Sequence, residues 1–385
     1  MSDDVMTTAQ EAPSPRRRRV SVKALPQHNR VHNRALILQA LFHQGAMSRA
    51  DLARESGLTR PTVSVLVAEL EADGIVSEIG TREDVRVGKP ATLVEIEPDA
   101  FHMIVLDLSS ADRFVGAVVN LRGEIVDRAE IEIDGAVKED AIARVIRLGE
   151  RLSALTTRRI LGIGVGSPGI VDDRGVVREA LHLGWFDLPL KQRLAEHFRV
   201  PVRVANDANV SALGVHTFRE IEGLSLMVVT IEHGVGVGLI IGGSLVEGEQ
   251  FSAGEIGHVT VEDDGDLCTC GRRGCLEVVI GASYLRDRTR GLDEAARNAV
   301  LTHAGTALGI VAAPVISAVN LNEVVLSGPA ELLDGPFIEA ALKTVRARTL
   351  SAVSNGLSMR TTRDDSDLVL LGGASLVLQA ELGVS

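Results

Sequence analysis

The three cysteines of this 385-residue chain lie within eight residues of one another, and a histidine precedes them closely. Cys268, Cys270 and Cys275 follow His258 in the order His-x9-Cys-x-Cys-x4-Cys. Thiolate sulfur and imidazole nitrogen are the ligands of tetrahedral structural zinc sites. The alternative is three reduced cysteines beside an unrelated histidine, but no thiol occurs elsewhere in the chain. The spacing therefore predicts a structural Zn²⁺ held by these four side chains.

Polar side chains suited to a sugar flank this cysteine block and recur at a second place. Glu255 and Glu277 bracket the block, while Asn206 and Asp207 follow a short apolar stretch that reads as a strand. Hydroxyl groups donate to carboxylates and accept from amide or imidazole N–H groups. By itself, the Asn-Asp pair could equally be an Asx turn that caps the next helix. Taken together, the residues expected to bind a sugar are Asn206, Asp207, Glu255, His258 and Glu277.

The segment that must position these residues has the alternating strand and helix pattern of an α/β fold, and this pattern occurs twice. Three apolar strands followed by a helix are predicted early in the segment, and a second group of strands followed by helices comes later. Two copies of one unit indicate a bilobal body, and the region between two lobes is a common place for a small molecule to bind. The predicted strands are 103–108, 114–120 and 124–133, then 226–231, 236–241 and 244–247, with helices at 139–155 and after 280.

The segment before this body reads as three short helices with clear end signals. Ser48 and Asp51 form a capping-box pattern at the start of the second helix, which should stop at Gly57. The third helix should follow Thr59, with Pro61 in its first turn, where the missing N–H costs nothing. A helix, a tight turn and a second helix form a helix-turn-helix. The apolar stripe expected for the first helix is Val31, Ala35, Leu38, Leu41 and Phe42.

Two predicted strands, 74–79 and 91–96, complete a winged helix-turn-helix whose connecting loop is basic. The opening of a recognition helix contacts base edges in the major groove, and basic wing residues contact the backbone or the minor groove. The alternative is a helical bundle that serves only dimer contacts, which would not explain the basic wing. The residues expected to contact double-stranded operator DNA are Arg49, Arg60, Thr62, Ser64, Arg86 and Lys89.

Charge is divided unevenly along the chain, whose formal net charge is −12. Residues 1–98 hold 13 basic and 13 acidic side chains, whereas residues 99–385 hold 27 and 39. An N-terminal segment richer in basic residues, followed by an acidic body, suits a protein that binds a polyanion through its N-terminal segment alone. Residues 1–28 are polar and Arg-rich, so we expect a disordered basic arm, either a solvated tail or a nonspecific phosphate contact.

No apolar run in the sequence is expected to reach the ~18–20 residues that a membrane helix needs, so no membrane partner is expected. The cysteines form a single cluster instead of being spread as disulfide partners, which suits a reducing compartment. We therefore expect a cytoplasmic protein.

These motifs resemble the ROK family (repressors, open reading frames and kinases), and within it the xylose-repressor and N-acetylglucosamine-repressor branch. The similarity extends over about 29–385 and is most specific from Gly257 to Glu277, with support from 205–209, 166–169 and 183–185. It implies an actin-like (ribonuclease H-like), two-lobed sugar-kinase fold with structural zinc. It also places the sugar contacts and zinc ligands at the positions named above, with Asp207 at the position of the kinase base. The domains expected are the arm 1–28, the winged helix-turn-helix 29–98 and the sugar-binding body 99–385 with its zinc loop 258–275.

The chain departs from the kinases of this family where ATP phosphates would bind. Their Asp-x-Gly-Gly-Thr loop reads here Asp107-Leu-Ser-Ser-Ala-Asp112, so serines replace both glycines. A second expected Gly-Thr pair reads Glu232-His233, and position 182 is His where regulators of the family often carry Asn. Phosphoryl transfer depends on positioning and charge neutralisation, so we expect no kinase activity although Asp207 remains.

The function predicted is a sugar-responsive DNA-binding transcriptional regulator, most simply a repressor of carbohydrate metabolism or uptake genes. Reading two half-sites requires a homodimer or homotetramer, and the effector is a sugar or sugar phosphate. One alternative is an ATP-dependent sugar kinase with a DNA-binding extension. Another is a constitutive DNA-binding protein or scaffold whose cleft is vestigial.

Overall fold

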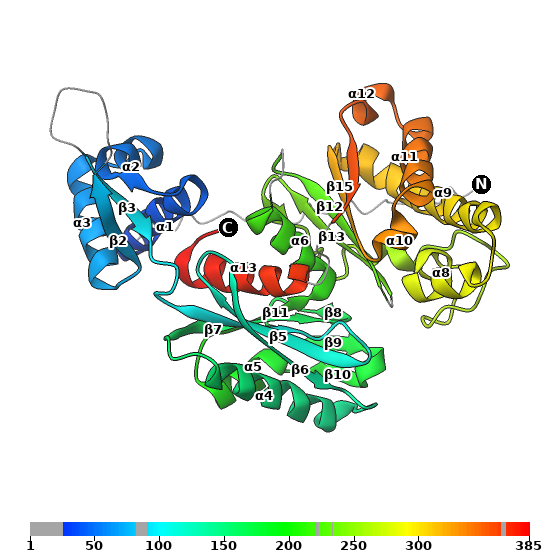
Figure 1. The fold of residues 1–385 in the computed structure, drawn as a ribbon, viewed down its shortest axis with the longest axis horizontal. Helices are drawn as coiled ribbons and strands as arrows, with labels where there is room; N and C mark the ends of the chain where they lie inside the picture. Colours follow the sequence, from blue (N-terminus) through cyan, green and yellow to red (C-terminus); the bar gives the residue numbers. More distant parts are fainter. Residues whose placement is uncertain (1–25, 82–90, 220–222, 233, 363–366) are drawn as a thin grey trace, which may run out of the picture.

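A computed structural model describes residues 26–81, 91–219, 223–232, 234–362 and 367–385 (Figure 1). Residues 1–25 of the predicted arm, the wing loop with Arg86 and Lys89, and His233 therefore lie outside the described residues. The first helix begins at Pro26, three residues earlier than the predicted start of the DNA-binding domain.

The N-terminal head is a winged helix-turn-helix whose local signals act as predicted. The Ser48 hydroxyl accepts from the Asp51 backbone N–H at 3.2 Å, and Gly57 ends the helix in the left-handed conformation at φ 69°. Thr59 caps the next helix, which has Pro61 in its first turn. A short strand that the sequence did not reveal joins the wing sheet, whose order is β1-β3-β2. The elements are α1 (Pro26–Gln44), β1 (Met47–Ser48), α2 (Arg49–Ser56), α3 (Arg60–Ala72), β2 (Val76–Thr81) and β3 (Thr92–Ile96).

The first lobe of the body is a five-stranded sheet in the order β11-β7-β4-β5-β6. Helices α4 and α5 cover one face, and α6 and α13 cover the other (Figure 1). The elements are β4 (His102–Asp107), β5 (Arg113–Asn120), β6 (Ile125–Glu132), α4 (Lys138–Ala154), β7 (Ile160–Ser167), β8 (Ile170–Val171), β9 (Val177–Ala180), η1 (Leu181–Leu183), β10 (Trp185–Leu188), α5 (Leu190–Phe198), β11 (Val202–Asn206), α6 (Asp207–Phe218) and α13 (Leu368–Leu382).

The second lobe repeats the plan with the sheet order β14-β13-β12-β15-β16. Here α6 packs on β12 and β13, so this helix contacts the sheets of both lobes. The predicted recurrence of a strand-and-helix unit is therefore correct. The elements are β12 (Leu226–Ile231), β13 (Val235–Ile241), β14 (Ser244–Leu245), η2 (Glu255–His258), α7 (Leu276–Ile280), α8 (Ala282–Thr289), α9 (Glu294–Val319), β15 (Glu323–Ser327), α10 (Ala330–Leu333), α11 (Pro336–Arg348), α12 (Ser351–Ser354) and β16 (Ser358–Thr361).

The head and the first lobe share one hydrophobic core. Ile37 and Leu41 of α1 belong to the same buried cluster as Val105 of β4 and Val377 of α13. One predicted member is wrong, because Val31 is 70% exposed. A shared core fixes the head against the body, unlike a head joined only by a flexible linker.

One described helix, α9, is long and apolar enough to cross a membrane by length and composition, so the expectation that no apolar run reaches this length was wrong. In the structure 56% of that apolar window is buried. The helix packs along α11 and contributes Leu301, Leu308 and Ile316 to the core of the second lobe. Its apolarity is accounted for by this packing, as in a core helix.

Candidate functional site

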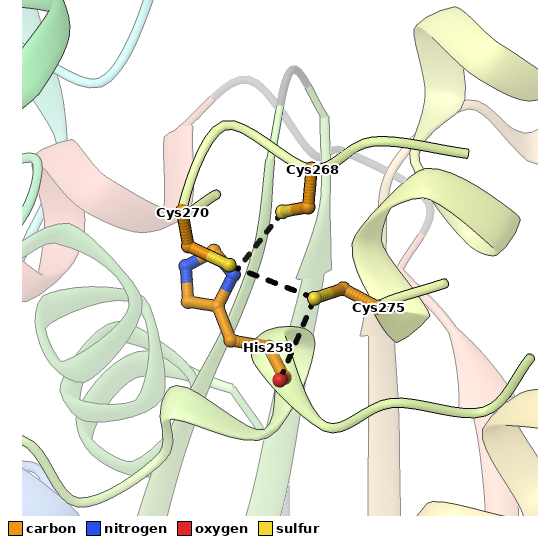
Figure 2. Close-up of side chains that lie close together, drawn as sticks. All are labelled: His258, Cys268, Cys270 and Cys275. Carbon is orange, nitrogen blue, oxygen red and sulfur yellow. Dashed lines mark hydrogen bonds between the residues drawn. The ribbon is translucent and has the colours of Figure 1, made fainter. Parts of the chain in front are cut away.

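The predicted zinc ligands converge from η2, the loop after it and the start of α7 (Figure 2). One ligand atom from each of His258, Cys268, Cys270 and Cys275 lies within 4.8 Å of the others. The Nδ1 atom of His258 is 3.5 Å from the Cys268 sulfur, and the Cys270 and Cys275 sulfurs are 3.6 Å apart. Tetrahedral bonds of about 2.3 Å place sulfurs roughly 3.8 Å apart. The four side chains therefore fit a metal ion of this geometry.

The thiols of this group differ in their electrostatic surroundings. A hydrogen bond from the Arg272 backbone lowers the pKa of the Cys270 thiol to about 6. Burial raises the pKa of the Cys275 thiol to about 12. A bound cation would favour the thiolate at both positions, because metal ligation deprotonates a thiol. The donor set is thus suited to a divalent soft or borderline cation.

Glu277 joins the metal loop to the second lobe. One carboxylate oxygen accepts from the Cys268 thiol at 3.5 Å and from the Thr269 hydroxyl at 3.3 Å. The other oxygen accepts from the Val235 backbone N–H at 3.3 Å. A Cβ at Gly234 would lie 3.1 Å from the same carboxylate, so the glycine leaves room for it. The Glu277 carboxylate therefore contacts both the cysteine loop and the start of β13.

His258 uses its two ring nitrogens in different directions. While Nδ1 faces Cys268, Nε2 lies 3.9 Å from a carboxylate oxygen of Glu255. Partial burial raises the pKa of Glu255, the charge of His258 opposes that rise, and Glu277 adds to it. These three side chains consequently form one electrostatic group next to the metal loop.

Asn206 and Asp207 stand where β11 becomes α6. Asn206 is the N-cap of α6, because its Oδ1 accepts from the Asn209 backbone N–H at 3.1 Å. Its Nδ2 donates to the Gly169 carbonyl at 2.9 Å. The Asx-turn alternative is therefore realised at Asn206, and both ends of this amide are engaged in shaping the turn. The adjacent Asp207 begins α6 with its side chain half-buried.

The pKa of Asp207 lies well above its ordinary value. Burial, with the nearby charge of Asp107, raises the pKa of Asp207 to about 7, and Glu255 adds to the rise. The influence of Glu255 brings a residue of the second lobe into the surroundings of a first-lobe carboxylate. We call Asn206, Asp207, Glu255, His258 and Glu277 the inter-lobe site.

The loop after β4 is closed by its own side chains. Asp107 accepts from the Ser109 backbone N–H at 2.9 Å and from the Ser109 hydroxyl at 2.6 Å. The Ser110 hydroxyl accepts from the Asp112 backbone N–H at 3.2 Å. Burial raises the pKa of Asp107. A loop that cradles phosphates presents backbone N–H groups to the ligand, whereas these two N–H groups already have side-chain acceptors.

The predicted DNA contacts separate into three groups. Arg60 and Ser64 are exposed on α3. Thr62 is half-buried, with its hydroxyl 2.8 Å from that of Thr59, so it takes part in capping. Arg49 pairs with Glu71 at 3.0 Å and Glu78 at 2.6 Å, which ties α2 to α3 and the wing. Arg86 and Lys89 lie outside the described residues.

Two features escaped the sequence analysis. Val65 is 57% exposed on the outer face of α3. It could have been found, because it lies off the buried stripe formed by Val63, Leu66, Val67 and Leu70. Phe42 of α1 meets Phe218 of α6 edge-on at 5.8 Å, a contact between distant segments that no local pattern predicts.

Comparison with known proteins matches both parts of the chain. Residues 109–380 match the ROK family model, and residues 32–77 match a model described as winged helix-turn-helix DNA-binding. The xylose repressor of Caldicellulosiruptor bescii is 28% identical over 382 residues, covering 90% of this chain and 95% of the repressor. The glucokinase of Halalkalibacterium halodurans is 31% identical over 304 residues, covering 69% of this chain and 92% of the glucokinase.

The fold agrees with a crystal structure of a ROK family transcriptional regulator described as a homologue of the Escherichia coli Mlc protein. The two superpose with a TM-score of 0.80 at 23% identity, covering 92% of this chain and 97% of the other. The family match spans most of the chain, with the head and body arranged as described above. This chain belongs to the ROK family and carries an N-terminal winged helix-turn-helix.

Proposed function

We propose that this protein is a sugar-responsive transcriptional repressor, which binds operator DNA through its head and a sugar or sugar phosphate at the inter-lobe site. The observation that carries this proposal is the pairing of a winged helix-turn-helix with a sugar-kinase-like body in one chain, joined through a shared core. Full-length similarity to a xylose repressor supports the same role.

On the DNA side, we assign the base and phosphate contacts of α3 to the exposed Arg60 and Ser64. Arg49 and Thr62 act as positioning residues, since the first holds α2 against α3 and the second shapes the start of α3. Arg86 and Lys89 remain proposed backbone contacts of the wing. Dimers of helix-turn-helix proteins read two half-sites, so the functional form is a homodimer or homotetramer.

On the sugar side, Asp207 and Glu255 would accept from sugar hydroxyls, and the Nε2 of His258 would complete the set. Glu277 would contact the sugar from beside the metal loop. Asn206 would contribute only the hydrogen-bonding capacity of its amide that remains beside the bonds to Gly169 and Asn209. Zinc held by His258 and the three cysteines would crosslink the loop and fix the ring of His258 in this direction. A metal-bound histidine commonly uses its second ring nitrogen for such an outer contact.

The helix α6 offers a direct route from the sugar to the DNA. Its first residue is Asp207, and its last is Phe218, which packs on Phe42 of the head. Twelve helical residues span about 18 Å. Gly214 of α6 faces the backbone of α13 so closely that a Cβ would lie 2.4 Å from the Leu368 carbonyl. A shift of α6 on sugar binding would therefore move α13 and the head with it.

A sugar kinase is the second candidate, because a carboxylate with a pKa near 7 suits a general base. Against it stands the loop after β4, in which the Ser109 and Asp112 backbone N–H groups already donate to the side chains of Asp107 and Ser110. Phosphoryl transfer needs such groups on the phosphates. We therefore assign Asp207 to sugar binding without catalysis.

The proposal is tested by fluorescence anisotropy of the full chain on DNA from upstream of its own gene. Salt is titrated first, then a panel of sugars and sugar phosphates. Tight, salt-sensitive binding that one sugar releases or strengthens is the expected result. Binding that no sugar alters would refute the sugar response, and a lack of specific binding would refute the regulator.

A further inference from the structure

The exposed face of the recognition helix α3 carries one cation and otherwise small side chains. The exposed residues of α3 are Arg60, Pro61, Ser64, Val65, Ala68 and Ala72. Apart from Arg60 these side chains are small. The backbone of the later turns of α3 can therefore approach a binding surface closely. Val65 lies at the middle of this face, with Pro61 four residues before it and Ala68 three residues after it.

Val65 is the exception among the branched apolar residues of α3. Val63 and Val67 are fully buried and Leu66 is 4% exposed, whereas Val65 is 57% exposed. A single exposed valine is ordinary on a protein surface. This one, however, lies beside Ser64 on the face that a helix-turn-helix inserts into the major groove.

The charges around this face favour DNA. Glu69 of α3 pairs with Arg30, and Asp73, which follows the helix, pairs with Arg34. Glu71 pairs with Arg49. Each carboxylate is thus held on a side that faces α1 or α2. The exposed face keeps Arg60, which makes no ion pair with any residue that the structure describes.

We propose that Val65 is a specificity-determining residue that contacts the 5-methyl group of a thymine in each operator half-site. In the major groove this methyl is the apolar group that distinguishes thymine, and small apolar side chains recognise it. The proposal rests on the proposed DNA-binding function. It goes further by naming thymine as the base that the apolar residue of α3 selects.

The test uses uracil, which pairs as thymine does but lacks the methyl group. The full chain first selects its preferred sequence from a random duplex library. Each thymine of the enriched duplex is then replaced singly by deoxyuridine, and the dissociation constant is measured by anisotropy for the wild type and for Val65→Ala. Alanine is a better helix former than valine, so α3 is retained in this variant. Its circular dichroism spectrum checks that.

At one thymine of each half-site, the wild type should bind the uracil duplex about fourfold more weakly, as expected for one methyl group removed from contact. Val65→Ala, which lacks the two γ-methyl groups of valine, should show a smaller ratio between the uracil and thymine duplexes than the wild type does. The matched control Val137→Ala changes a valine of similar exposure, 44%, in the body. It should keep the wild-type ratio.

The outcomes separate the inference from the function beneath it. If selection enriches no sequence, the DNA-binding function itself fails. If a sequence is enriched but no thymine-to-uracil change weakens binding, or if the loss persists unchanged in Val65→Ala, then the assignment of Val65 is overturned while the regulator stands.

Discussion

The proposed sugar site and the loop after β4, where kinases of the family are expected to bind ATP phosphates, differ in how their side chains are engaged. In the proposed sugar site, Asp207, Glu255, His258 and Glu277 are electrostatic neighbours, and four side chains that could hold a metal ion lie next to them. In the loop after β4, the Ser109 hydroxyl donates to the Asp107 carboxylate, and the Ser110 hydroxyl accepts from the Asp112 backbone N–H.

This contrast indicates which parts of a kinase site a regulator needs. Recognition of a sugar requires positioned acceptors and donors, which the proposed sugar site would supply. Phosphoryl transfer in addition requires free backbone N–H groups and neutralised charge, whereas the Ser109 and Asp112 N–H groups of the loop after β4 already have side-chain acceptors. The predictions below would sharpen or break this contrast.

The largest effect is expected from loss of the metal. Cys270→Ser should abolish stoichiometric zinc, because structural sites of this kind contribute on the order of 10 kcal/mol and depend on every ligand. Metal content by mass spectrometry should fall towards zero, and the sugar response of DNA binding should be lost with it. Thr269→Ala, which removes a neighbour that is no ligand, should retain the metal. A full zinc equivalent in Cys270→Ser would refute the assignment.

Next in size is the loss of a sugar acceptor. Asp207→Asn should weaken sugar binding roughly 10- to 100-fold, the usual value of a hydrogen bond to a charged group. DNA binding without sugar should remain, because Asp207 lies outside the head. Calorimetry with the sugar that acts on the wild type measures the change, with the exposed Asp173→Asn as the matched control. Unchanged affinity in Asp207→Asn would remove Asp207 from the site.

A smaller effect concerns pH. Burial raises the pKa of Asp207 to about 7, so the folded protein keeps this proton over a range in which the unfolded chain has lost it. The free energy of unfolding should therefore fall as pH rises from about 4 to about 7, by roughly 2 kcal/mol for this partly exposed group. Urea denaturation of the wild type and Asp207→Asn across this range measures the difference. Parallel curves for the two proteins would contradict the prediction.

The smallest effect is expected at the contact between head and body. Phe218→Ala removes an edge-on aromatic pair worth about 1 kcal/mol beyond its buried area. Sugar affinity should stay near the wild-type value, while the change in DNA affinity that sugar causes should shrink severalfold. The exposed Phe186→Ala, 62% accessible, is the control. A full sugar response in Phe218→Ala would exclude this route.

Much of the head could be predicted because its signals are local. Ser48, Gly57 and Thr59 determine helix ends within a few residues of themselves, and the structure has them in those roles. The engagement of Arg49 could not be predicted, since Glu71 and Glu78 lie 22 and 29 residues away. The exposure of Val31 was missed for the same reason, because only the packed structure decides which side of a helix is covered.

In the body, spacing predicted the metal group, because its ligands lie close together in the sequence. Spacing could not predict that Asn206 would use both ends of its amide in the turn, one of them on Gly169, 37 residues away. Nor could it reveal that α6 joins the inter-lobe site to the head through Phe218. Long-range packing of this kind depends on the whole fold.

The most direct test of the contrast measures the sugar response of DNA binding and phosphoryl transfer in one sample. The full chain is mixed with ATP, magnesium and its selected operator duplex, and DNA anisotropy and ADP release are recorded while a sugar is added. We predict that the effective sugar changes the anisotropy and that no sugar-dependent ADP forms. Steady ADP production that requires the sugar and disappears in Asp207→Asn would contradict the account and establish a kinase.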